Sequence, residues 1–585
     1  FEDSWALAVT GLATYWQGAY PADRLDQFYA VMLQTAEDSG HPYLAEALLR
    51  HTIDIREQAG TKIPKNLIRE GMLHLELANL LKQRQENIEA EQQAQISASR
   101  LAAAAQDYPE DFIIFGETRP PGADLQLQEM ERTLATLQSM RSLVERSQYK
   151  ELALNYYRLL GHIQFRLRRL DDAAASFESA IGIANTALES LANAQDRQSW
   201  LLATDESYRG EVRVLLAQKK DSIALEKWER YQGWPLLHGS ISDERMSASD
   251  KRGPSLASMA LPATHGTRLI YASFQDGLQI WSVKGSKLQS TWVNVKRSDL
   301  LDNIRTFADQ CATPDSGLSD IDNQGLKLYS LLVQPVASEL IDSQTVVVEF
   351  DDSLGGLSME GLKMPAGSYF GEKYAIVYSP GIWMEQHLRV PAPIARTDSL
   401  TLLDATHSKD AGPLPGIEEE RKAITEDFIR PKVIDAANAN RSMVQAQLTG
   451  SEIIHIMGHG RPAGTGTDLV LNEKHSLGAD DFTADVLTRS QMVVLAACSS
   501  GHGKEGLLDT RNLVHSVLLA GVPRVVASRW NVDSESTSQL MISFYQHVTE
   551  QETAAQAMRD ARKRVMTTRV HPYYWAGFSV IGRVN

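Results

Sequence analysis

A histidine and a cysteine close two apolar runs in the last third of the chain. Ile453–Met457 leads into a glycine-flanked His459, and Met492–Ala496 leads through one alanine into Cys498, which small residues follow. Cysteine attacks a carbonyl carbon as its thiolate, and a neighbouring histidine can supply the base near neutral pH. Together these two residues could perform acyl transfer or peptide hydrolysis.

The elements that must position this pair are buried strands. Besides the two runs above, apolar runs occur at Thr345–Phe350, Tyr374–Tyr378, Leu400–Leu403 and Arg524–Ala527, and Arg268–Phe274 with Leu278–Val283 flank a turn at Asp276-Gly277. Helical stretches lie between several of them, which predicts an α/β sandwich with helices on both faces. Parallel neighbouring strands would bring His459 and Cys498 to one carboxyl edge, where open α/β sheets build their sites. We expect His459 in a tight turn there.

The first 238 residues have a different character. They are rich in Ala, Leu, Gln, Glu and Arg, and Tyr43–Glu57 and Leu67–Gln83 place apolar residues at helical spacing. Six residues lie at the spacing of a tetratricopeptide repeat, namely Tyr157, Leu160, Gly161, Ala173, Phe177 and Ala180. Asn185 replaces the repeat's closing proline, so the second helix should run on. Such a solenoid would present a concave surface to a peptide or protein; the alternative is a helical bundle that binds no ligand.

A segment rich in Ser, Asp and Gly, Gly239–Ser258, separates the two characters and is predicted to be a linker. We therefore divide the chain into a tetratricopeptide-like region at 1–238, a linker at 239–258, and two α/β parts at 259–395 and 396–585. A chain of 585 residues is too long for one core.

Net charge and cysteine content argue against some classes of protein. Lys and Arg number 58 against 74 Asp and Glu, a net charge of −16, which argues against a direct nucleic-acid surface. With only two cysteines, Cys311 and Cys498, no disulfide framework beyond a single bridge is possible, which favours the reducing cytoplasm. No apolar run is long enough to span a membrane. The first residue is Phe1 rather than Met, so we expect a trimmed start.

The C-terminal part resembles the CHAT domains, caspase-like peptidases of the clan that holds caspases, metacaspases and separase. The resemblance covers about residues 260 to 585. Its motifs are Leu414–Glu420, which leads into a helix, His459-Gly460, Ala497–Gly501, Ala520–Val526, Ser528–Asp533 and His571–Phe578. Helical repeats before a CHAT domain are a common pairing in bacteria.

The resemblance implies a mechanism and a site. His459 would act as general base and then general acid, and Cys498 would form a thioester acyl-enzyme. The backbone N–H groups of Gly460 and Cys498 would hold the oxyanion. In the substrate pocket, Ala496 stands where metacaspases have an acid and caspases a glutamine. Asp533 resembles an acid of separase-like enzymes and could line the pocket instead; the alternative is an N-cap for a helix at Ser534–Val548.

Other candidate residues receive structural roles. His455 lies on the same strand face as His459 but lacks the following glycine, so we interpret it as structural. His475 and His502 fall in predicted loops, and Cys311 at the end of a helical stretch is interpreted as core. No metal-ligand spacing and no cofactor motif is present, so neither is predicted.

The leading hypothesis is an endopeptidase that cleaves specific protein substrates. By resemblance, residues 259–395 would form an inactive caspase-like lobe. A partner bound to the repeats, either a regulatory protein or a ribonucleoprotein such as a CRISPR effector, would control the active part in bacterial defence or signalling. One alternative is a non-catalytic scaffold in which the CHAT-like part is a recognition module. Another is a hydrolase or transferase that uses the same thiolate on non-peptide acyl groups.

Overall fold

The computed structural model describes residues 41–59, 150–191, 194–237, 266–340, 344–406, 414–463, 466–497 and 512–584, with single positions between 29 and 141. The chain divides into two compact units, Phe1–Gln218 and Lys219–Asn585. The predicted linker lies outside the described residues, and the described positions of Leu67–Gln83 are helical, as predicted. The predicted domain boundaries stay a prediction.

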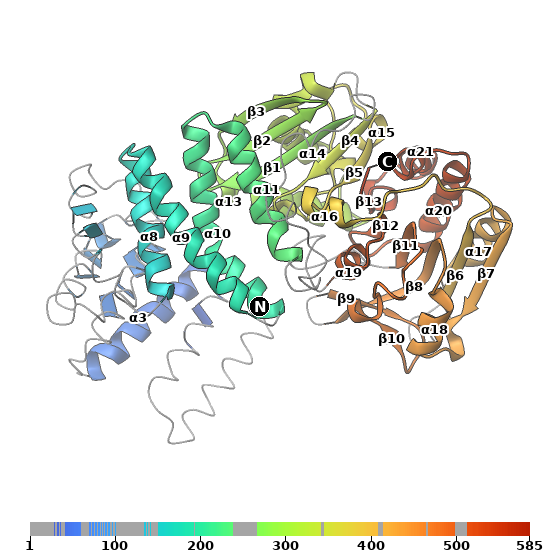
Figure 1. Cartoon of the computed structure of the whole chain (residues 1–585), viewed down its shortest axis with the longest axis horizontal. Helices are drawn as coiled ribbons and strands as arrows, with labels where there is room; N and C mark the ends of the chain where they lie inside the picture. The colour runs from blue at the N-terminus through green and yellow to red at the C-terminus, as the bar shows by residue number, and fades with distance from the viewer. Residues whose placement is uncertain are drawn as a thin grey trace. The chain divides into compact units, whose positions relative to one another are not determined.

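The first unit is helical in its described part, as predicted (Figure 1). Its helices are α3 (Pro42–Ala59), α8 (Lys150–Arg166), α9 (Leu170–Ser190) and α10 (Ala194–Ala217). Phe177 of α9 is fully buried, and a Cβ atom on Gly161 of α8 or Gly210 of α10 would lie only 2.9 or 2.3 Å from its ring. Asn185 stays inside α9 and accepts a hydrogen bond from the Tyr208 hydroxyl at 2.7 Å. The helix therefore runs on where a repeat would close.

The second unit is a mixed α/β domain. Its helices are α11 (Asp221–Leu237), α13 (Arg297–Ala312), α14 (Leu318–Leu332), α15 (Phe370–Lys373), α16 (Ile382–His387), α17 (Ile417–Glu426), α18 (Arg441–Leu448), α19 (Leu513–Leu519), α20 (Ser534–Thr549) and α21 (Ala554–Met566). Its strands are β1 (Thr267–Phe274), β2 (Gly277–Lys284), β3 (Lys287–Val293), β4 (Thr345–Glu349), β5 (Ala375–Tyr378), β6 (Ser399–Ala405), β7 (Arg430–Asp435), β8 (Ile453–Ala463), β9 (Gly466–Val470), β10 (Ser476–Leu477), β11 (Met492–Ala497), β12 (Arg524–Ser528) and β13 (Phe578–Gly582). Every predicted strand and the predicted hairpin are confirmed.

The described strands form one continuous sheet with two halves of opposite direction. Its order is β7-β6-β8-β11-β12-β13-β5-β4-β1-β2-β3, and β9 and β10 continue from β8 as a ribbon. Strand β13 runs antiparallel to β12 but parallel to β5. The carboxyl ends of β1, β4 and β5 (the first half) therefore lie at the sheet edge opposite to those of β6, β8, β11 and β12 (the second half).

Helices cover both faces of the sheet, as predicted. In β1, the Tyr271 hydroxyl donates to the Leu332 carbonyl at the end of α14 at 2.9 Å. Phe274 points to the other face because side chains alternate along a strand. Its ring packs against Trp228 of α11, with centroids 6.4 Å apart. Cys311 is fully buried at the end of α13, so its interpretation as core is confirmed.

Candidate active site

The two strands that precede the predicted pair are hydrogen-bonded neighbours. Strands β8 and β11 run parallel, and their last paired residues are Gly458 and Ala497. In the sequence the next residues are His459 on β8 and Cys498 after β11. His459 is half-buried, and Cys498 lies in the segment 498–511, outside the described residues. The prediction that two parallel neighbouring strands lead to the pair is confirmed.

His459 does not lie in a tight turn, and that prediction was wrong. Strand β8 continues to Ala463, and His459 pairs with Val470 of the antiparallel strand β9. The physical reason is that Gly466–Val470 folds back and supplies a new hydrogen-bonding partner where β6 and β11 end. His459 and Gly460 are therefore strand residues at the point where β8 passes from the main sheet into the β9–β10 ribbon.

Gly458 allows close packing beside this point. It pairs with Ala405 at the end of β6 on one side and with Ala497 on the other. A Cβ atom at position 458 would lie 3.0 Å from both the Cβ and the carbonyl oxygen of Ala405. Any larger residue would push the end of β8, and His459 with it, away from β6.

A serine on the next strand holds the backbone before Cys498. Ser528 ends β12, is fully buried, and donates its hydroxyl to the Ala497 carbonyl at 2.6 Å. Arg529, which follows it, is held at both ends: its backbone N–H donates to Gly577 and its Nε to the Ser579 hydroxyl at 2.8 Å each. The segment that leaves β12 is thus fixed against the start of β13.

A buried polar cluster ties β8 to two helices. The ring of His455 is fully buried, with Nε2 at 3.0 Å from Glu420 Oε1 of α17 and Nδ1 at 3.1 Å from the Tyr545 hydroxyl of α20. The second Glu420 oxygen accepts from Ser538 of α20 at 2.8 Å. Burial, and then the charge of Glu420, raises the pKa of Tyr545. The structural interpretation of His455 is confirmed.

The two proposed pocket residues differ in their surroundings. Ala496 is buried, with 9% of its surface exposed, and pairs with Met457. Asp533 is the N-cap of α20, and its carboxylate accepts from the Ser536 N–H at 2.9 Å. The N-cap interpretation is confirmed, and a substrate contact for either residue stays a prediction.

The remaining candidates do not join this site. His475 is exposed in the turn between β9 and β10, and His502 lies outside the described residues. Burial raises the pKa of the Cys311 thiol, which keeps it protonated. Among the described residues, no group of His, Cys, Asp and Glu could hold a metal ion.

Sequence reasoning gave no individual role to Glu420 or Ser528, although both stand in quoted motifs. A signal exists for each. Glu420 is the third residue of an acidic run, and helical spacing places it on the same face as Ile424, which is fully buried. Ser528 is a hydroxyl at the last position of an apolar strand, where a neighbouring backbone end must be satisfied.

Part of the chain matches a known domain family. Residues 323–583 match the CHAT domain. The CHAT match begins inside α14 and ends after β13, so α11, α13 and β1–β3 lie before it although they share the same unit. The resemblance in the sequence motifs is confirmed for this range, whereas the tetratricopeptide assignment stays a prediction. No curated protein matches the chain.

Several solved structures resemble the chain. The Saccharomyces cerevisiae separase–securin complex matches with a TM-score of 0.47 and 9% identity, covering 96% of this chain and 48% of the separase chain. The chain thus spans about half the length of that separase. The pro- and mature domains of Porphyromonas gingivalis RgpB match with a TM-score of 0.32 and 11% identity, covering 49% of this chain and 75% of that one. The Arg-specific cysteine proteinase gingipain R gives 0.33 and 11%, covering 49% and 74%.

Within the described residues, no helix combines the length and apolar character that crossing a bilayer requires.

Proposed function

We propose that the chain is a cysteine endopeptidase that uses His459 and Cys498 as a catalytic dyad. The observation that carries this proposal is the β8–β11 register, in which Gly458 pairs with Ala497, the two residues that immediately precede the dyad. In the sequence the next residues are His459 and Cys498, and paired parallel strands lie about 4.8 Å apart, which supports the proposal that the two side chains act together. The CHAT match over the same strands supports the assignment.

In the proposed mechanism His459 takes the proton from the Cys498 thiol, and the thiolate attacks the scissile carbonyl carbon. The N–H groups of Gly460 and Cys498 donate to the oxyanion that forms. His459 then protonates the leaving amine, which departs and leaves a thioester. Water, deprotonated by His459, hydrolyses the thioester and regenerates the thiol.

We propose that the part before residue 396 is an inactive caspase-like lobe that supports the active one. The described residues at the carboxyl ends of β4 and β5 are Glu349 and Ser379, which are both buried. The Ser379 hydroxyl lies 3.4 Å from Glu349 Oε2 and 2.5 Å from Glu385 Oε1, so it contacts carboxyl groups and not a base of the histidine type. Cys311, the cysteine of this part, is fully buried. Neither feature suits attack on a peptide.

We further propose that the helical region is a tetratricopeptide-like solenoid whose partner, a protein or ribonucleoprotein, controls the dyad. The close packing of α8, α9 and α10 around Phe177 supports a stacked helical array. A role in bacterial defence would require such control, since an unchecked intracellular protease is harmful.

The test is labelling by an electrophilic peptide probe, followed by intact-mass and peptide mass spectrometry. Wild type is compared with Cys498→Ala, His459→Ala and the matched control Cys311→Ala, each with and without candidate partners. We expect one label on Cys498, lost in the first two variants and kept in the control. Labelling that appears only after a partner is added would support control through the helical region.

Inertness of Cys498 under every condition, in folded protein that still binds partners, would contradict the peptidase proposal. Labelling by simple acyl electrophiles with no cleavage of any peptide library would instead indicate acyl transfer to non-peptide substrates.

A further inference from the structure

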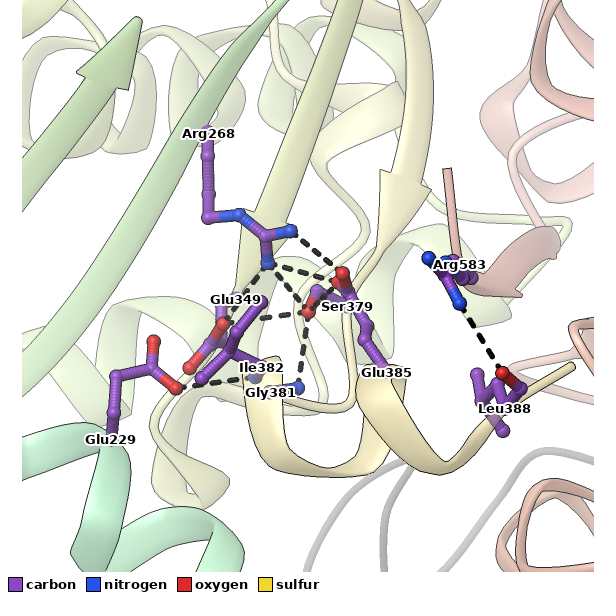
Figure 2. A network of polar contacts seen from close by, with 9 residues as sticks. All are labelled: Glu229, Arg268, Glu349, Ser379, Gly381, Ile382, Glu385, Leu388 and Arg583. Carbon is purple, nitrogen blue, oxygen red and sulfur yellow. Dashed lines mark hydrogen bonds and ion pairs between the residues drawn. The ribbon is translucent and has the colours of Figure 1, made fainter. Parts of the chain in front are cut away.

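Three carboxyl groups and one guanidinium group meet inside the second unit, away from the proposed dyad (Figure 2). Arg268 of β1 is held by both oxygens of Glu385 of α16, at 2.9 and 2.8 Å, and by Glu349 of β4 at 3.4 Å. Glu229 of α11 is the third carboxyl and accepts from the Ile382 N–H at 3.2 Å. The four charged side chains are between 0% and 6% exposed.

The carboxyl groups of Glu229 and Glu349 lie near each other: a Cβ atom on Gly381 would be 3.9 Å from Glu229 Oε2 and 3.7 Å from Glu349 Oε1. Oε1 of each is buried with no hydrogen-bond partner among the described residues, and a proton on one carboxyl group that is shared with the other would satisfy both. The charges also demand it: three carboxylates against one guanidinium leave an excess of two negative charges in a buried site, and one proton halves the excess.

Helix α11 contributes Glu229 to this buried contact. Its apolar contacts include Trp228 against Phe274 and Gly233 against Trp383, where a Cβ on Gly233 would lie 2.5 Å from the Trp383 Cβ. Because α11 follows α10 after only Gln218–Lys220, it is where the α/β unit first holds the chain that arrives from the helical region.

We propose that α11 can detach from the rest of the α/β unit, and that one proton shared between Glu229 and Glu349 holds it in place. Loss of this proton would then weaken the docking of α11. The inference does not depend on the peptidase chemistry proposed above. The charged groups that face the shared proton are Arg268 from β1 and Glu385 from α16, in addition to the pair itself.

The direction of the pH effect follows from the two carboxyl pKa values. Burial raises the pKa of Glu229, and burial with the negative charge of Glu229 raises the pKa of Glu349 well above the ordinary carboxyl range. The docked state therefore binds a proton that undocked α11 releases at ordinary carboxyl pKa values. Docking is strongest below that ordinary range and falls about tenfold per pH unit until the raised pKa is passed.

The experiment is hydrogen–deuterium exchange of the full chain from pH 5 to pH 9, read as protection factors of α11 amides, with α14 amides as an internal reference for global unfolding. Wild type is compared with Glu229→Gln and Glu349→Gln, whose amides can donate the same hydrogen bond without a titrating proton. Glu226→Gln, on the same helix but outside the pair, is the matched control.

We expect α11 protection in wild type and in Glu226→Gln to fall by up to about tenfold per pH unit and to stay below α14 protection at every pH, so that α11 opens before the unit unfolds. In Glu229→Gln the α11 protection should be independent of pH and at least tenfold above wild type at pH 8. Constant α11 protection across the range in wild type, or a Glu229→Gln profile equal to that of Glu226→Gln, would overturn the proposal. If a Gln variant does not fold, the wild-type α11 slope decides alone, measured where α11 protection lies below α14 protection.

Discussion

The two halves of the central sheet use the same kind of position in opposite ways. At the carboxyl ends of β4 and β5, Glu349 and Ser379 are each 3% exposed and are enclosed by α11 and α16. At the carboxyl ends of β8 and β11, the sequence places a half-buried His459 and then Cys498. The ends of β4 and β5 hold helices in place, whereas the ends of β8 and β11 lead into the two residues of the proposed dyad.

The difference shows that a position at the carboxyl edge of two parallel strands does not by itself make a residue functional. Both edges collect polar side chains because strand ends leave backbone groups and loops to be satisfied. In the first half these side chains form hydrogen bonds and ion pairs with Arg268 and with one another. In the second half, Gly458 allows close packing against Ala405, and the Ser528 hydroxyl holds the Ala497 carbonyl, next in the chain to the proposed dyad.

Removing the cation of the first half should have the largest effect on stability. Arg268→Met leaves Glu385 and Glu349 buried without their guanidinium partner, which should lower the free energy of unfolding by about 3–5 kcal/mol. Chemical denaturation measures it. Arg305→Met, at an exposed position of α13, is the control and should change little. A loss below about 1 kcal/mol would mean that the first half does not depend on its charged cluster.

Opening the buried cluster of the second half should cost less. Glu420→Ala removes the hydrogen-bond partner of His455 and Ser538, for an expected loss of about 2–3 kcal/mol in the same denaturation experiment. Glu419→Ala, on the exposed side of α17, is the matched control. Equal effects of the two substitutions would contradict the role assigned to the cluster.

Substitutions of two serines at strand ends should distinguish a residue that supports the proposed site from one that supports a helix. Ser528→Ala should cost about 1 kcal/mol and slow Cys498 labelling roughly tenfold to a hundredfold, because the Ala497 carbonyl loses its donor. Ser379→Ala should cost a similar amount and leave labelling unchanged. Slower labelling in both variants to the same degree would dissolve the distinction between the halves.

The smallest expected effect concerns Asp533. Asp533→Ala should lower the free energy of unfolding by about 1 kcal/mol through loss of the α20 N-cap, and Asp533→Ser should restore it. The ratio of the cleavage rate after basic residues to that after neutral residues should be the same in both variants as in wild type. Loss of cleavage after basic residues alone, in both variants, would show that Asp533 reads the substrate.

The sequence predicted the strands well because their apolar runs are continuous and bounded by turns, as in Ile453–Met457 and Met492–Ala496. It missed the continuation of β8 through His459, since that strand is completed by a partner, Gly466–Val470, that local pattern does not announce. It also missed the Glu229–Glu349 contact. Pairing of residues 120 positions apart depends on the docking of α11, which periodicity within one helix does not encode.

The central claim, that the β8–β11 register makes His459 the base for Cys498, is tested most directly by the pH dependence of Cys498 alkylation. Wild type and His459→Ala are compared in a Cys311→Ala background, so that one thiol is observed. We predict an alkylation profile whose pKa lies below the free-thiol value of about 8.5 in wild type and rises to about that value without His459. Identical profiles in the two proteins would contradict the claim.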